Sequence, residues 1–188
     1  MKKLLLVVAV LFFVAAVTVP ASAQGKFSLS IGGDVLVPMG TFGDAYSIGF
    51  GGSARGEYAF TPEVSGGATV GYYTWSAKDV PAGVSKPKFS GVPVRVYGKY
   101  FFMPPNTPRV YGMVELGLFF WSSSATVLGV DYSTTGSDFN FAPGVGIEIP
   151  AGDKLKMDLS ARYDLISTTG ETTGNLGIRV GVNFVLGK

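Results

Sequence analysis

Eight segments of the chain alternate apolar and polar residues over roughly ten positions each. The last segment shows the pattern most clearly, in the run Leu176, Gly177, Ile178, Arg179, Val180, Gly181 and Val182. Such alternation predicts β-strands whose two faces meet different surroundings. We predict strands over residues 26–37, 47–60, 63–75, 89–102, 109–121, 138–149, 154–166 and 175–187, with no helix of normal length between them.

The N-terminus carries an export signal. Lys2 and Lys3 precede an apolar run from Leu4 to Val17, and Ala21-Ser22-Ala23 forms an A-x-A cleavage site. These features are typical of a secretory signal peptide. The alternative is an uncleaved membrane anchor, but the 16 residues from Leu4 to Val19 are fewer than the roughly 20 that a spanning helix needs. We therefore predict a cleaved signal peptide over residues 1–23 and one mature domain over residues 24–188.

The charge balance changes when the signal peptide is removed. The whole chain has 15 Lys and Arg against 13 Asp and Glu, and the loss of Lys2 and Lys3 leaves 13 of each sign. No nucleic-acid partner follows from a neutral mature chain. The 27 glycines and 14 phenylalanines are typical of strands and turns. The chain has no cysteine, which excludes disulfides and thiolate metal sites.

The expected connections alternate between short turns and longer loops. The short ones cover residues 61–62, 103–108 and 150–153, and the longer ones cover residues 38–46, 76–88, 122–137 and 168–174. Strands of about 11 residues, tilted by about 40–45°, span about 26 Å, which matches the apolar band of an outer-membrane barrel. Short turns of such barrels are periplasmic and long loops are outside the cell. The predicted fold is an all-β, eight-stranded antiparallel up-and-down transmembrane β-barrel in the bacterial outer membrane, with both termini in the periplasm.

The polar faces of the predicted strands carry equal numbers of bases and acids. The bases are Arg55, Arg95, Lys99, Lys156, Arg162 and Arg179, and the acids are Asp34, Glu57, Glu115, Glu148, Asp158 and Asp164. The interior of an eight-stranded barrel is just wide enough to be filled by side chains, and charges buried there must be paired. Inward glycines leave room for the long side chains. We therefore predict an interior closed by a charge network.

Two other interpretations remain open from these patterns. One is a narrow polar channel of porin type, which keeps the same inward charges but leaves a water path. The other is a secreted lipocalin-like barrel that carries an apolar ligand. The lipocalin interpretation requires the opposite polarity, with charges facing water and Phe, Val and Leu lining a cavity.

Aromatic residues and prolines add two further expectations. Aromatic residues cluster near the strand ends, and ring side chains prefer headgroup depth, so we expect two interfacial belts. The expected belts comprise Tyr58, Phe60, Tyr100, Phe101 and Phe102 beside the short turns, and Tyr72, Tyr73, Trp75, Phe120 and Trp121 beside the long loops. Pro93 and Pro143 fall inside predicted strands, where proline removes a ladder donor. We expect a bulge at each, or a later strand start at Pro93.

Several motifs resemble a known family. The run from Gly32 to Tyr46, followed by Gly49-Phe50-Gly51-Gly52, resembles the first hairpin of the outer-membrane protein beta-barrel domain family. Val92-Pro93-Val94-Arg95 with Tyr100-Phe101 is similar to the fourth strand of that family. The resemblance covers essentially the whole mature chain. It implies a small OmpX/OmpA-type barrel, a type often without assigned biochemical activity.

The C-terminus resembles the sorting signal that the barrel-assembly machinery reads. Its residues are Arg179, Gly181, Phe184 and Leu186, although the chain ends on Leu186-Gly187-Lys188 instead of an aromatic residue. The expected partners are outer-membrane lipid and lipopolysaccharide, the barrel-assembly machinery and periplasmic chaperones during biogenesis, and an extracellular partner of the loops.

No motif for catalysis stands out. The chain contains no histidine, which is the usual general base. The run Gly49–Ala54 matches a dinucleotide-binding fingerprint only in its letters, because it lies in a predicted strand with no helix after it. The loop acids Asp44, Asp79, Asp131 and Asp138 are too scattered for a calcium site. We therefore expect no enzymatic activity, no metal and no cofactor. The predicted role is structural, for envelope integrity or surface contact.

Overall fold

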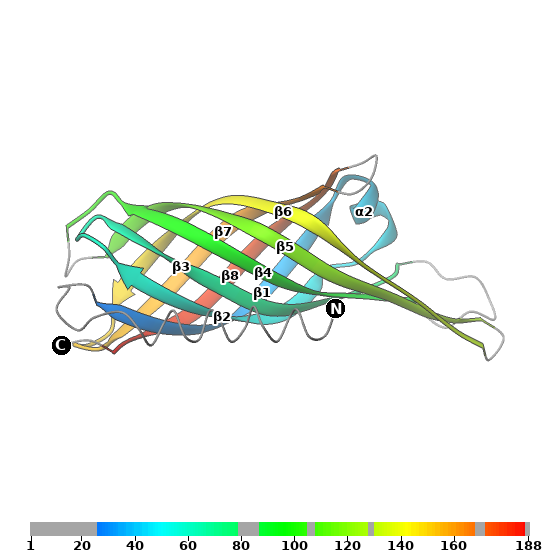
Figure 1. Ribbon diagram of the computed structural model, residues 1–188, viewed down its shortest axis with the longest axis horizontal. Helices are drawn as coiled ribbons and strands as arrows, with labels where there is room; N and C mark the ends of the chain where they lie inside the picture. Colours follow the sequence, from blue (N-terminus) through cyan, green and yellow to red (C-terminus); the bar gives the residue numbers. More distant parts are fainter. Residues whose placement is uncertain (1–25, 79–86, 105–107, 128–129, 168–171, 187–188) are drawn as a thin grey trace.

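The computed structural model describes residues 26–78, 87–104, 108–127, 130–167 and 172–186. Eight strands form one closed barrel in which each strand pairs with its neighbours in sequence and β1 pairs with β8 (Figure 1). Every pairing is antiparallel. The strands are β1 (Phe27–Met39), β2 (Gly49–Ala59), β3 (Val64–Ser76), β4 (Lys88–Phe101), β5 (Arg109–Val127), β6 (Val130–Pro150), β7 (Leu155–Ser167) and β8 (Thr172–Val185). The predicted up-and-down barrel is confirmed, and the predicted signal peptide lies outside the described residues.

The two faces of the barrel have opposite polarity. In β8, Ile178 and Val180 are exposed on the outside, whereas Arg179 between them is completely buried inside. The same alternation gives an apolar outer wall and a polar lumen around the barrel. A lipocalin-like carrier does not fit this arrangement, because its apolar side chains face inward. Among the described residues, no helix is both long enough and apolar enough to cross a membrane.

The connection between β5 and β6 differs from the sequence-based expectation. Residues 122–137 were predicted to form a loop, but β5 continues to Val127 and β6 begins at Val130. The ladder between them is unbroken from Arg109↔Glu148 to Val127↔Val130. Backbone hydrogen bonds hold this polar ribbon, whose Thr and Val residues favour extended backbone. Figure 1 shows the β5–β6 hairpin extending past the other strands at the loop end of the barrel.

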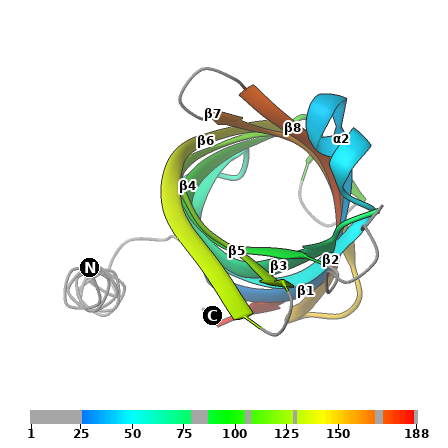
Figure 2. The ribbon, with the colours of Figure 1, turned by 90° about the vertical axis from the view of Figure 1, so that its right-hand side faces the viewer.

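A short helix also lies at the loop end. Residues of the predicted loop 38–46 form α2 (Gly40–Ala45), which begins at Gly40 with a positive φ of 61°. Figure 2 shows α2 at the rim of the barrel beside β8, and the helix contacts β1 and β8. Phe42 of α2 and the following Tyr46 pack against the buried aromatic cluster below them. The helix therefore covers part of the barrel mouth.

The two strand prolines are accommodated without the expected bulges. β4 starts at Lys88 and runs through Pro93, and the register of β3 with β4 is the same before and after it, from Val70↔Val94 to Tyr73↔Gly91. Only the two bridging pairs in between are missing. Pro143 leaves a similar gap between β6 and β7 without a register shift. Each proline therefore interrupts the ladder on one side of its strand, while the pairing on its other side continues.

The prediction of two aromatic belts is correct only in part. Phe60, Tyr100 and Phe102 are exposed on the outer wall at the short-turn end, as predicted. However, Phe101 is buried in the lumen, and so are Tyr73 and Trp75 at the loop end. Trp121 packs against this interior cluster. The correction follows from strand geometry, because consecutive residues point to opposite faces and only one of Tyr72 and Tyr73 can face outward.

Candidate functional site: the charged lumen

The twelve predicted lumen charges all lie inside the barrel, and each has an oppositely charged partner within 4 Å. They come from every strand except β3. Except for Lys156, whose side chain is 32% exposed, and Glu57 and Asp164, which are slightly exposed, their side chains are at most 2% exposed. Charges removed from water to this extent are stable only when they are paired and hydrogen-bonded.

The first group of charges lies toward the loop end. Arg162 Nη1 is 2.9 Å from Asp34 Oδ1, and Arg162 Nε is 3.2 Å from Asp164 Oδ2. Arg95 pairs with the other oxygen of Asp164. Both arginines donate to the hydroxyl of Tyr73, at 2.9 Å and 3.1 Å. Asn140 accepts from Arg95 at 3.1 Å. One tyrosine and one amide thereby add neutral hydrogen-bond acceptors to two buried guanidinium groups.

Glu115 and Asp158 connect this group to the rest of the network. Glu115 lies 2.7 Å from Arg55 Nη2 and 3.0 Å from Arg95 Nε, so it connects β5 to the adjacent strand β4 and, across the lumen, to β2. Asp158 Oδ1 is 3.0 Å from Arg179 Nη1 and 3.6 Å from Arg55 Nη1. Two acids in the middle of the barrel therefore tie together three arginines.

The second group surrounds Lys99 toward the short-turn end. Lys99 Nζ lies 2.7 Å from Glu57 and 3.2 Å from Glu148. Its ammonium also stands 4.4 Å from the centre of the Tyr111 ring, a favourable cation–π arrangement. Lys156 reaches the other oxygen of Glu148 at 3.1 Å. This lysine is the partly exposed member that connects the network to the short-turn end.

Neutral side chains extend the network, and none of them was named as a site residue from the sequence. Arg179 donates to Ser30 at 2.7 Å and to Ser53 at 2.9 Å, and Ser53 donates to Asp34 at 2.6 Å. Tyr97 and Tyr111 donate to Glu57 and Asp158. All of these residues occupy inward positions of the same alternation that identified the charges. The alternation of inward and outward positions along each strand could therefore have predicted them from the sequence.

Inward glycines make room for the arginines, as expected from the sequence. A Cβ at Gly32 would lie 2.7 Å from the Arg179 guanidinium carbon, and a Cβ at Gly181 would lie 2.3 Å from Arg179 Nη1. Neither position can therefore carry a larger side chain unless Arg179 moves. The two glycines face each other across the β1–β8 pair. They form the space in which Arg179 lies.

Apolar groups cover the network at both ends. At the loop end, Leu36, Tyr73, Trp75, Phe119 and Ile166 form a buried cluster, and Phe42, Tyr46, Phe89 and Trp121 pack against it. Between this cluster and the charges is a cavity of only about 10 Å³, which has room for about one water molecule. At the short-turn end, the Arg109 guanidinium lies 3.7 Å from the centre of the Phe101 ring and donates to the carbonyls of Pro62 and Met103.

The four residues of the predicted assembly signal lie on both faces of the barrel wall. Arg179 and Gly181 face the lumen, whereas Phe184 and Leu186 are exposed on the outer wall. A sorting role for these four residues stays a prediction. Within the residues that the structure describes, no three His, Cys, Asp or Glu side chains form a group that could hold a metal ion.

An apolar wall around a paired, charged lumen defines a transmembrane β-barrel. The model of the outer membrane protein beta-barrel domain matches residues 9–184. The chain belongs to this family, and it is a bacterial outer-membrane barrel. No curated protein matches the chain.

Solved structures of small outer-membrane barrels share the fold. Neisserial surface protein A is 16% identical, with a TM-score of 0.59 over 84% of this chain and 96% of its own. Ail, the attachment invasion locus protein of Yersinia pestis, is 16% identical, with a TM-score of 0.57 over 86% and 99%. A major outer membrane protein from Thermus thermophilus is 17% identical, with a TM-score of 0.61 over 87% and 100%. At these identities the likeness concerns the fold.

Proposed function

We propose that this protein is a non-conducting outer-membrane barrel that holds the β5–β6 hairpin at the cell surface, where the hairpin contacts a partner outside the cell. In this proposal both termini are periplasmic, and outer-membrane lipid and lipopolysaccharide surround the wall. The barrel-assembly machinery and periplasmic chaperones act during biogenesis. The observation that carries the proposal is an exposed, hydrogen-bonded hairpin on a barrel whose lumen is filled by paired charges.

The filled lumen favours a plug over a channel. The acids and bases pair across the barrel, for example Arg162 with Asp34 at 2.9 Å and Arg55 with Glu115 at 2.7 Å. Opening a water path requires breaking several buried pairs, and removing one partner from such a pair costs about 3–5 kcal/mol. The aromatic cluster at the loop end adds a second closure. A narrow porin-like channel is therefore the less favoured function.

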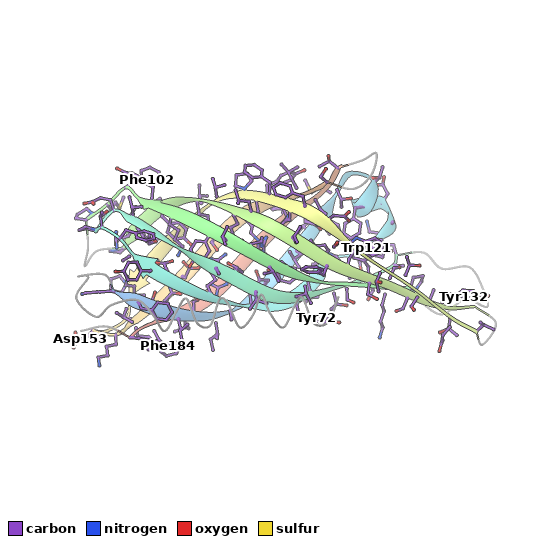
Figure 3. All side chains as sticks on the ribbon, viewed as in Figure 1. Tyr72, Phe102, Trp121, Tyr132, Asp153 and Phe184 are labelled. Atoms are coloured by element: carbon purple, nitrogen blue, oxygen red, sulfur yellow. The ribbon has the colours of Figure 1, made fainter. Side chains whose placement is uncertain are left out.

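Hydrogen bonds hold the β5–β6 hairpin, and its tip exposes apolar side chains. Thr126 donates to Asp131 at 2.6 Å near its tip, and Trp121 donates to Asp138 at 2.6 Å near its base. Residues 130–135 are all exposed, and Val130 and Tyr132 expose apolar surface among Ser and Thr residues. Tyrosine is enriched at the cores of protein interfaces. Figure 3 shows Tyr132 near the tip, far from Asp153 at the other end of the barrel.

The lumen carboxylates favour a structural role over catalysis. A general acid or base must exchange a proton with a substrate within hydrogen-bond reach. Glu115 and Asp158 are instead held by arginines and a tyrosine deep in the barrel. The chain also has no histidine. We therefore propose no enzymatic activity and no cofactor.

A shortened hairpin tests the contact role. Trp121 pairs with Gly136, so replacing residues 122–135 with Asn-Gly closes the same ladder with a two-residue turn. Cells that produce the wild type, the shortened variant or Asp153→Ala are compared for attachment to surfaces coated with proteins or polysaccharides. Heat-modifiable gel migration confirms that each barrel is folded.

We expect attachment by cells with the wild type and with Asp153→Ala, and at least a fivefold loss with the shortened variant. Equal attachment by the shortened variant and the wild type would overturn the contact role. Equal attachment by cells that lack the protein would overturn it as well.

A further inference from the structure

The outer wall of the barrel contains a shallow apolar groove that the charged lumen does not explain. Its volume is about 770 Å³, and it crosses the wall from β3 to β8. The floor is formed by Gly98, Gly112, Pro143 and Ala161. Tyr100, Val114, Val145 and Tyr163 are among the residues that form its sides. Lys99 and Arg162 also line the groove, but their side chains point into the lumen, where they form ion pairs.

The groove exists because small residues occupy neighbouring outward positions. Gly98 pairs with Val114, and Gly112 pairs with Tyr100, on the adjacent strands β4 and β5. A Cβ at Gly98 would meet no atom within 4 Å, and a Cβ at Gly112 would touch only the Phe102 ring at 3.5 Å. Both positions have space for a side chain on the outside of the barrel. The groove therefore exists because these outward positions carry glycine, and neighbouring side chains do not fill the space.

We propose that this groove binds one acyl chain of a membrane phospholipid along its length. The outward side chains that line it carry no charge, which matches a hydrocarbon chain. Crossing six strands at about 4.8 Å spacing gives a path of about 24 Å. One leaflet is about half of a hydrocarbon core that is about 30 Å thick. The path is therefore longer than an acyl chain that lies within one leaflet. The volume is also in the range of roughly 300–1,000 Å³ of small-molecule sites.

The position of the groove favours a lipid over a second copy of the chain. It is continuous with the apolar wall that faces the membrane, so lipid is the molecule always in contact with it. A groove about 24 Å long and a few side chains wide offers much less area than the roughly 800 Å² per partner of a standard protein interface. Val64 and Tyr100 lie at its short-turn end, and tyrosine prefers headgroup depth. The lipid headgroup is therefore placed at that end.

Native mass spectrometry of the protein, incubated with dipalmitoyl phosphatidylethanolamine in detergent, tests this site. The groove is filled in Gly98→Leu and in Gly98→Leu/Gly112→Leu. Gly33→Leu is the matched control, because Gly33 also faces outward with no atom within 4 Å of its Cβ and does not line the groove. Heat-modifiable gel migration confirms folding, and the single variant keeps the test valid if the double variant does not fold.

We expect a discrete adduct of one phospholipid on the wild type and on Gly33→Leu, and at least a fivefold lower bound fraction on the groove-filling variants. An adduct of equal abundance on all proteins would overturn the proposal. Absence of a one-lipid adduct on the wild type would overturn it too. A lipid-free dimer that the groove-filling variants abolish would assign the groove to a second copy and would also contradict it.

Discussion

Arg55 Nη2 and Glu115 Oε1 lie 2.7 Å apart in the middle of the lumen, and both side chains are buried. The two residues are on β2 and β5, so the contact crosses the interior of the barrel. Arg95 holds the second oxygen of Glu115 at 3.0 Å. One carboxylate thus contacts two buried guanidinium groups, and we expect the stability of the closed lumen to depend on its charge.

Glu115→Gln is predicted to lower the free energy of unfolding by about 3–5 kcal/mol, because it leaves buried charge uncompensated. Urea unfolding of the barrel in lipid vesicles measures the change. Asp153→Asn, in an exposed turn, is the control and should change stability by about 0.5 kcal/mol or less. If both variants were equally stable, Glu115 would not be an essential part of the network.

The polarity of the outer wall predicts different results for two valines of similar exposure. Val180, 56% exposed, lies midway along β8, and Val130, 54% exposed, lies near the hairpin tip. Val180→Arg should cost about 2–4 kcal/mol, because it places a charge in the lipid midplane. Val130→Arg should cost about 0.5 kcal/mol or less, because its side chain is in water. The same unfolding assay distinguishes the two. Equal, small costs would mean that Val180 does not face lipid.

Two neighbouring glycines on β1 test the space inside the barrel. A Cβ at Gly32 would lie 2.7 Å from both the Arg179 guanidinium carbon and the Val180 carbonyl oxygen, whereas a Cβ at Gly33 would meet nothing within 4 Å. Gly32→Ala should therefore destabilise the barrel by about 1–3 kcal/mol through overpacking. Gly33→Ala should be tolerated. Thermal unfolding followed by heat-modifiable gel migration ranks them, and a stable Gly32→Ala variant would contradict the packing described.

The absence of native cysteine allows the orientation to be tested with single cysteines. Thr134→Cys lies in the exposed hairpin, and Asp153→Cys lies in the short turn at the opposite end. A membrane-impermeant maleimide should label Thr134→Cys in intact cells. It should label Asp153→Cys only after the outer membrane is permeabilised. The reverse labelling pattern would invert the proposed topology.

The part of this molecule that could be predicted from its sequence follows from the alternation of inward and outward residues along each strand. Arg179 between Ile178 and Val180 must face away from lipid, and the same logic located all twelve lumen charges. The pairs themselves could not be predicted. Arg162 meets Asp34 from 128 positions away, and which residues meet across the lumen depends on the stagger of the whole closed barrel.

Two of the expectations that failed have identifiable physical reasons. Tyr73 and Trp75 were placed at the lipid interface because they cluster with other aromatic residues, although their parity matches that of lumen residues. Residues 122–137 were predicted to be a loop because they are rich in Ser and Thr and lack apolar alternation. A two-stranded ribbon in water needs no apolar face at every step, since its ladder is formed by backbone groups.

Conductance of the purified protein in planar lipid bilayers tests the closed lumen most directly. Insertion of the folded barrel is confirmed by its heat-modifiable migration after recovery from the membrane. The paired charges and the aromatic cluster predict no steady current across the inserted protein at moderate applied voltage. A steady, open-channel current from the wild-type barrel would contradict the account.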